Sequence, residues 1–196
     1  GGKDTGVIKG IDARKNYIIR KSVNLSKQYH IIASNVDQAI LIATIIQPQT
    51  RLEFIDRFLV TASAYSIPVT ILINKLDVYS DTELEILADW SMIYEEAGIN
   101  LIPISVEKEI NLEKVDALLK DKVSVVSGNS GVGKSSLLNK ISSDFELRTS
   151  EISEAHEQGV HTTTFAEMVE LPEGGFVIDT PGIRGLGIVD IEREEL

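Results

Sequence analysis

The chain of 196 residues contains no cysteine, which excludes disulfide bonds and cysteine-ligated zinc sites within it. It also lacks an apolar run long enough to span a membrane, and no secretory signal opens it, so we expect no membrane partner. What is present, 43% hydrophobic and 25% charged residues, fits one α/β domain with a small appendage.

Basic residues are scarce outside the first part of the chain. The formal net charge is −11, which argues against a nucleic-acid-binding role for the chain taken whole. Residues 1–36 nevertheless hold seven Lys and Arg against two Asp, whereas residues 37–196 carry a net −16. This asymmetry indicates either a basic arm on an acidic domain or an ordinary solvated face. We place the boundary at residue 36, where short alternating strands that are too few for an independent core give way to longer elements.

The most informative stretch is a strand, a glycine-rich loop and a helix in direct succession. Val123–Val126 is a β-branched run, and Leu137, Leu138 and Ile141 repeat at helical spacing. The segment between them fits the phosphate-loop spacing. Its backbone N–H groups and the helix N-terminus suit phosphate oxygens, Lys134 suits the β- and γ-phosphates, and Ser135 suits Mg²⁺. The alternative is a glycine turn that caps a helix. The predicted phosphate-binding residues are Gly128, Asn129, Ser130, Gly131, Val132, Gly133, Lys134, Ser135 and Ser136.

Strand and helix patterns alternate through the rest of the chain. Apolar runs predict buried strands at 39–46, 69–73 and 101–104, and a helical pattern follows each of them. One predicted helix has Thr82 as its N-cap and buries Ile86, Trp90, Ile93 and Ala97 along one stripe. Alternation of this kind predicts a mainly parallel sheet with helices on both faces, and binding loops at the carboxyl ends of the strands.

A second polar motif, Asn74-Lys75-Leu76-Asp77, follows the buried strand at 69–73. A carboxylate at Asp77 can accept hydrogen bonds from N1–H and the 2-amino group of guanine, whereas adenine presents neither donor. Asn74 can tie this loop to the phosphate loop, and the stem of Lys75 can lie along the base. We include Ser105 and Val106, at the end of the next strand, among the nucleotide-binding residues. The alternative is a polar strand-to-helix turn.

Two further segments suit the γ-phosphate and its metal ion. Asp179-Thr180-Pro181-Gly182 ends a strand predicted to lie beside the phosphate-loop strand, so Asp179 can hold Mg²⁺ through water and the Gly182 N–H can meet the γ-phosphate. Among Thr162, Thr163 and Thr164 we choose Thr163 as the hydroxyl that completes the Mg²⁺ shell. A simple Pro-Gly turn and a β-branched strand start are the respective alternatives.

The motifs stand in rotated order, because the guanine motif precedes the phosphate loop. In Ras-like GTPases the phosphate loop comes first and the guanine motif comes late, so the pattern predicts a circularly permuted Ras-like P-loop GTPase domain. A fold tolerates such a permutation because domain termini tend to lie at the surface, often close together. At these residues the chain resembles the ribosome small-subunit-dependent GTPase A family, RsgA or YjeQ. The supporting segments are 14–16, 33–38, 56–59, 74–77, 128–136, 161–164 and 179–184.

The resemblance implies a GTPase switch in maturation of the small ribosomal (30S) subunit, with that subunit and its rRNA as partners and GTP and GDP with Mg²⁺ as ligands. A nucleotide site favours a cytoplasmic location. It implies that residues 1–36 are the last part of an OB-like β-barrel domain and that residues 37–196 are the GTPase domain. The family's zinc domain is not expected in this chain, which we interpret as truncated at both ends. We expect a monomer.

Hydrolysis of GTP to GDP and phosphate needs an oriented water molecule. Ras-like enzymes use a glutamine just after the Asp-x-x-Gly motif, but Ile183 stands there and cannot take this role. His161 is the catalytic candidate, as the resemblance also implies; the alternative is a solvated loop histidine. Slow intrinsic turnover that awaits a partner is expected. A nucleotide-responsive rRNA-binding module with incidental hydrolysis remains open, whereas Asp77 disfavours an ATPase or kinase.

Overall fold

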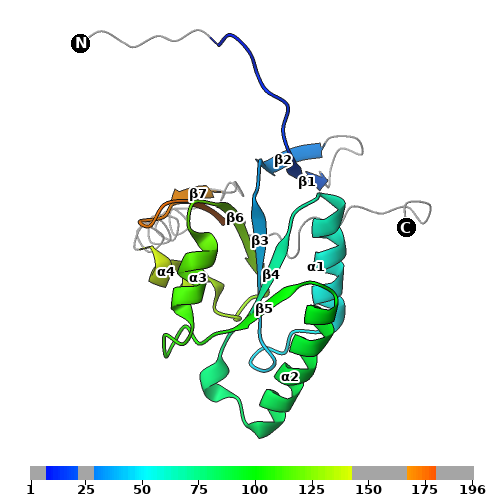
Figure 1. Ribbon diagram of the computed structural model, residues 1–196, viewed down its shortest axis with the longest axis vertical. Helices are drawn as coiled ribbons and strands as arrows, with labels where there is room; N and C mark the ends of the chain where they lie inside the picture. Colours follow the sequence, from blue (N-terminus) through cyan, green and yellow to red (C-terminus); the bar gives the residue numbers. More distant parts are fainter. Residues whose placement is uncertain (1–7, 22–28, 143–166, 180–196) are drawn as a thin grey trace, which may run out of the picture.

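The computed structural model describes residues 8–21, 29–142 and 167–179, and its centre is a six-stranded sheet (Figure 1). The strand order is β5-β4-β3-β6-β8-β7. All neighbours in it run parallel except β7 and β8, which form an antiparallel pair. The predicted mainly parallel α/β sheet is therefore confirmed.

The elements follow one another in the expected alternation. The sheet strands are β3 (Gln38–Ala43), β4 (Val69–Ile73), β5 (Asn100–Pro103), β6 (Val123–Gly128), β7 (Glu167–Glu170) and β8 (Phe176–Asp179). The helices are α1 (Leu52–Ala64), α2 (Asp81–Glu96), α3 (Leu112–Leu119) and α4 (Lys134–Ile141), with a 3-10 turn at Leu76–Val78. A separate antiparallel pair, β1 (Tyr17–Lys21) and β2 (Tyr29–Ser34), precedes them.

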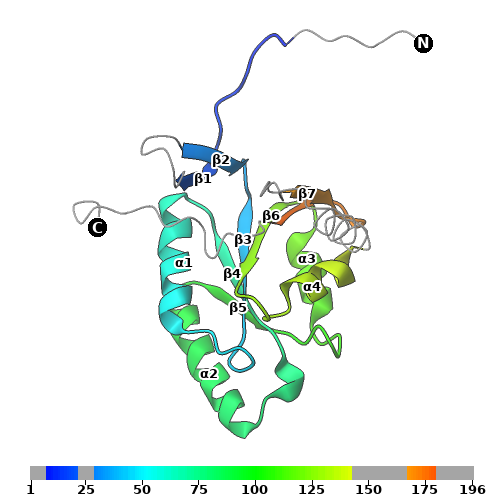
Figure 2. The same ribbon diagram turned by 180° about the vertical axis from the view of Figure 1, so that it is seen from behind.

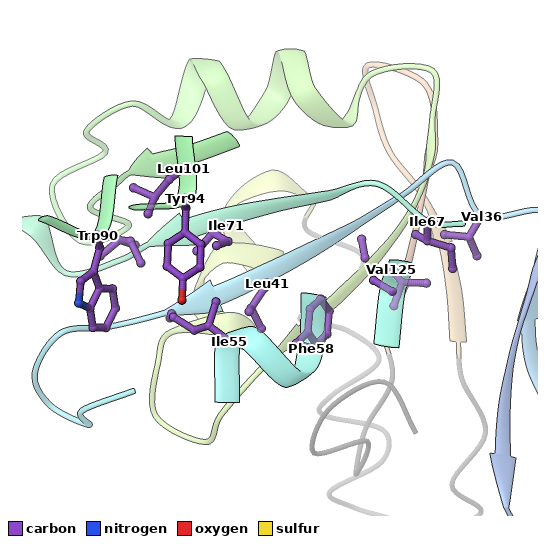
Figure 3. Packing of buried hydrophobic residues seen from close by; sticks show 14 of the residues in the cluster. Val36, Leu41, Ile55, Phe58, Ile67, Ile71, Trp90, Tyr94, Leu101 and Val125 are labelled. Carbon is purple, nitrogen blue, oxygen red and sulfur yellow. The ribbon is translucent and has the colours of Figure 1, made fainter. Parts of the chain in front are cut away.

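Two apolar layers hold helices on opposite faces of the sheet, because side chains alternate along each strand. Leu41 of β3 belongs to one buried cluster with Phe58 of α1 and Trp90 of α2. Ile40 and Ile42 belong to the other cluster, together with residues of α3 and α4. Figure 3 shows part of the first cluster, and Figure 2 shows α1 and α2 on one side of the sheet with α3 and α4 on the other. The prediction of helices on both faces is confirmed.

Strand β3 is the central strand by burial, since all six of its residues are buried. It pairs with β4 on one side and β6 on the other, and both ladders are parallel. Strand β3 ends at Ala43, so the predicted strand, which continued through Ile46, is too long by three residues. The chain turns there because Thr44 N–H donates to Thr50 Oγ1 at 3.0 Å and Thr50 N–H donates to Thr44 O at 2.9 Å.

The first residue of helix α2 and its buried side both differ from the prediction. Its N-cap is Ser80, not Thr82, because Ser80 and Glu83 form a capping box in which Ser80 N–H donates to Glu83 Oε2 at 2.8 Å. Burial falls on Leu87, Trp90 and Tyr94, whereas the predicted Ile93 is 50% exposed. Trp90 is in the core, as expected.

The β1–β2 pair is joined to the large sheet through one asparagine. Asn16 Nδ2 donates to Val36 O, and Val36 N–H donates to Asn16 Oδ1, both at 2.8 Å. Ile18 of β1 is fully buried in the cluster that contains Val36 and Leu41. The hairpin therefore shares a core with the sheet.

Candidate nucleotide site

The phosphate loop connects β6 to α4 at the carboxyl edge of the sheet, and its glycines are sterically required. Gly131 and Gly133 have φ of +84° and +96°, a backbone region that favours glycine. A Cβ at Gly128 would lie 2.6 Å from the Ile42 carbonyl oxygen of β3. Val132 is fully buried, which anchors the loop, while Ser135 and Ser136 are exposed on the first turn of α4. The loop thus leaves helix N-terminal N–H groups at the surface, where they suit an anion.

Asn74, at the end of β4, joins three loops. It is 3% exposed, and its Nδ2 donates to the Val132 carbonyl of the phosphate loop at 2.9 Å. Its Oδ1 accepts a hydrogen bond from Val106 N–H, beyond β5, at 3.1 Å. The predicted tie between the guanine motif and the phosphate loop is confirmed. Val106 takes part through its backbone, and its side chain is buried.

Asp77 and Ser105 are paired at the same edge. Ser105 is fully buried, and its Oγ donates to Asp77 Oδ1 while it accepts a hydrogen bond from Lys108 N–H at 3.0 Å. Asp77 lies in the 3-10 turn and is exposed. A fixed serine donor thus orients a carboxylate that stays accessible to a ligand.

Lys75 adopts the left-handed backbone conformation, with φ of +70°. Its ammonium donates to the Gln47 carbonyl in the loop after β3. The side chain therefore reaches from the guanine motif to the loop after β3.

Lys134 and Asp179 form an ion pair with Nζ and Oδ1 2.5 Å apart. They meet because β6 and β8 are parallel neighbours in which Val126 pairs with Asp179. The prediction that Asp179 ends a strand beside the phosphate-loop strand is confirmed. Thr163, His161 and Gly182 lie outside the described residues, so their predicted roles stay predictions.

A magnesium ion at this edge would rely on few protein ligands. Within residues 8–21, 29–142 and 167–179, no group of three or more His, Asp or Glu side chains could hold a metal. Ser135 and Asp179 supply hydroxyl and carboxylate oxygens, which suit Mg²⁺ when phosphate oxygens and water complete its shell. These donors fit an ion that arrives with a nucleotide.

Sequence reasoning missed two contributors to this edge, the loop Thr44–Thr50 and Tyr79. The Tyr79 hydroxyl accepts a hydrogen bond from Ile45 N–H at 3.0 Å and donates one to the Asn74 carbonyl at 2.6 Å. Tyr79 is five residues from Asn74 in the chain, but Ile45, its other hydrogen-bond partner, is 34 residues away. The apolar run through Ile46 gave no signal for the loop, because it continues three residues past the end of β3 at Ala43.

The strand order, the phosphate loop and the rotated succession of motifs define the class of circularly permuted P-loop GTPase domains. The model of the RsgA GTPase family matches residues 11–189, and the chain belongs to that family. It is 54% identical to the small ribosomal subunit biogenesis GTPase RsgA of Christiangramia forsetii and 47% identical to that of Bacteroides fragilis. Each alignment covers 98% of this chain and 61% or 62% of the relative. The chain therefore spans about three-fifths of these relatives' length.

Two solved structures share the fold. The crystal structure of YjeQ from Thermotoga maritima has a TM-score of 0.73 and 35% identity, covering 98% of this chain and 60% of that chain. The structure of YloQ, described as a circularly permuted GTPase, has a TM-score of 0.63 and 29% identity, covering 96% and 63%. Among the described helices, none is both long and apolar enough to cross a membrane.

Proposed function

We propose that this chain binds GTP with Mg²⁺ and hydrolyses it to GDP and phosphate. The observation that carries the proposal is the Asn74 side chain, which joins the guanine motif to the phosphate loop through Val132. A guanine nucleotide is long enough to need both loops at once, with its base at one and its phosphates at the other. Membership of the RsgA GTPase family supports this assignment.

The base end of the site contains Asp77, which would accept hydrogen bonds from guanine N1–H and its 2-amino group. Ser105 holds one carboxylate oxygen and thereby orients the other. The Lys75 stem would cover the base.

At the phosphate end, the loop N–H groups and Lys134 would hold the β- and γ-phosphates, so that the Lys134 ammonium leaves Asp179 for phosphate oxygens. Ser135 and Thr163 would bind Mg²⁺ directly and Asp179 would bind it through water. Gly182 would donate its N–H to the γ-phosphate, and His161 would position the attacking water. When bound, Mg²⁺ neutralises charge on the leaving phosphate.

We further propose that the whole protein acts as a switch in maturation of the small ribosomal subunit. Its partners would be that subunit and its rRNA, its location the cytoplasm, and its free form a monomer. The printed names of the relatives support this role. The β1–β2 pair forms its own sheet, which supports an OB-like barrel remnant in residues 1–36 ahead of the GTPase domain in 37–196.

Base recognition is tested by Asp77→Asn. The variant should lose GTP affinity by about 100-fold, because hydrogen bonds to a charged group contribute about 1.5–3 kcal/mol each, and it should gain affinity for xanthosine triphosphate. Asp89→Asn, an exposed carboxylate on α2, is the control and should bind GTP like the wild type. Unchanged GTP affinity in Asp77→Asn would refute the assignment of the base.

The switch is tested by multiple-turnover GTP hydrolysis with and without purified small ribosomal subunits. Stimulation by the subunits is expected, and His161→Ala should slow turnover while binding stays nearly intact. Equal rates with and without subunits would favour the alternative, an rRNA-binding module in which hydrolysis is incidental.

A further inference from the structure

The loop Thr44–Thr50, here named the β3 loop, lies between the two halves of the nucleotide site. Strand β3 has β4 and β6 as its neighbours, and all three run parallel. The guanine motif follows β4 and the phosphate loop follows β6, so the chain that leaves β3 at the same edge must emerge between them. Figure 1 shows β3 between β4 and β6.

The base of the β3 loop is closed by two buried threonines. Thr44 N–H donates to Thr50 Oγ1 and Thr50 N–H donates to the Thr44 carbonyl, and the two residues are 0% and 1% exposed. Thr44 Oγ1 also donates to the Pro48 carbonyl at 2.5 Å. These hydrogen bonds fix both ends of the β3 loop and its Pro48 carbonyl. The loop can therefore hold the neighbouring loops at a set distance.

Toward the guanine motif, the β3 loop makes two polar contacts. The Tyr79 hydroxyl links Ile45 N–H to the Asn74 carbonyl, and the Lys75 ammonium donates to the Gln47 carbonyl. Burial raises the pKa of Tyr79 above its usual value, so the hydroxyl keeps the proton that it donates across the neutral range. Both contacts end on backbone atoms of the β3 loop.

Toward the phosphate loop, the β3 loop places Pro48 beside Gly131. The Pro48 Cδ lies 3.3 Å from the point where a Cβ at Gly131 would be. The proline ring therefore occupies the space that a side chain at Gly131 would need. The β3 loop thus lies next to both loops that the proposed nucleotide would bridge.

We propose that Tyr79 and Pro48 are positioning residues through which the β3 loop sets the spacing of the guanine and phosphate loops, and so sets the rate at which guanine nucleotide leaves. The inference depends on the proposed nucleotide site. A ligand held at its base and at its phosphates dissociates when either loop moves away from the other. Removing a brace between the loops should therefore speed release more than it changes chemistry.

The first test compares Tyr79→Phe with Tyr94→Phe in the full 196-residue chain. Tyr94 is a buried tyrosine, whereas Tyr79 is half-buried. The Tyr94 hydroxyl donates one hydrogen bond, to Asp56 Oδ1 at 3.0 Å, and so links α2 to α1 instead of the β3 loop. Release of a fluorescent GDP analogue is followed after a chase with excess GDP. Tyr79→Phe should release the analogue about tenfold faster, the loss expected for one to two hydrogen bonds. Tyr94→Phe should release it at the wild-type rate.

The second test compares Pro48→Ala with Pro172→Ala, an exposed proline in the turn between β7 and β8. Pro48→Ala should speed release about threefold, and Pro172→Ala should not change it. Single-turnover hydrolysis of pre-bound GTP should be unchanged in the two controls, Tyr94→Phe and Pro172→Ala. In Tyr79→Phe and Pro48→Ala it should change less than the release rate does.

Wild-type release rates in both Tyr79→Phe and Pro48→Ala, or equal acceleration in the control variants, would overturn the brace while leaving the site intact. A wild-type chain that binds no GDP analogue would instead refute the proposed function.

Discussion

The side-chain amide of Asn74 donates to the Val132 carbonyl at 2.9 Å and accepts from Val106 N–H at 3.1 Å. An amide provides both a donor and an acceptor, which a carboxylate or a hydrocarbon at this buried position would not. One residue at the end of β4 thereby sets the distance between loops that follow β4, β5 and β6.

Replacing Asn74 with alanine should reduce both stability and GDP affinity. The change leaves Val106 N–H and Val132 O buried without this partner, which should cost about 2–4 kcal/mol in the free energy of unfolding. It should also lower GDP affinity by at least about tenfold, because the loops lose their tie. Urea unfolding and titration with GDP measure the two effects.

Asn16→Ala is the matched control for Asn74→Ala. Asn16 makes the same double hydrogen bond, to the backbone of Val36, but at the opposite edge of the sheet. This variant should lose stability and keep GDP affinity. If GDP affinity fell equally in both variants, the effect of Asn74 would be a general consequence of a weakened fold.

Gly133→Ala should abolish nucleotide binding. Its Cβ would lie 2.3 Å from Asn74 Nδ2, and its φ of +96° disfavours any other residue. Gly98→Ala is the control, since Gly98 also has a positive φ, +73°, but no atom lies within 4 Å of its added Cβ. That variant should lose only about 1–2 kcal/mol in the free energy of unfolding and retain affinity. GDP titration of Gly133→Ala with normal binding would contradict the proposed geometry.

Lys134→Ala should weaken GTP binding by about 100-fold or more, because charge-assisted hydrogen bonds to phosphate are lost. Lys140→Ala removes a lysine from the same helix, but Lys140 pairs at 2.6 Å with the exposed Glu109. Exposed ion pairs contribute little, so this control should bind GTP normally. Calorimetric titration distinguishes the two, and comparable losses would indicate a general charge effect.

Asp116→Asn should raise thermal stability at neutral pH. Partial desolvation, then the charges of Glu173 and Glu113, raise the pKa of Asp116. Asp116 and Glu173 line a cavity of about 230 Å³ between α3, α4 and the β7–β8 turn. Since the folded pKa exceeds the unfolded one, stability from the protonated carboxyl is fully present below the unfolded pKa. It is lost as pH rises through the folded pKa.

The midpoint of thermal unfolding should therefore rise by about one or two degrees in Asp116→Asn at pH 7. The gain should shrink as the pH is lowered through the raised pKa of Asp116, where the wild-type carboxyl takes up its proton. A gain that does not change with pH would show that charge is not its cause.

Much of the fold followed from local pattern. The phosphate loop was predictable because Gly131 and Gly133 occupy positive φ and the strand before them is β-branched. The face of α2 was not, because Ile86, Leu87 and Ile93 are similarly apolar and only packing against the sheet decides which of them is buried. Its start was also missed, because Ser80 and Thr82 both suit an N-cap and the Glu83 side chain decides between them.

By itself, the sequence determined the identity of the loops, since glycine spacing, strand ends and the succession of motifs are local properties of the chain. It also determined the family, through the rotated order of those motifs. Only the tertiary structure decided that the loop after β3 lies between the guanine motif and the phosphate loop. The reason is that neighbouring strands of a parallel sheet can be far apart in the chain. That order puts β3 between β4 and β6, and it brings Ile45 and Pro48 to a site that their own sequence surroundings do not indicate.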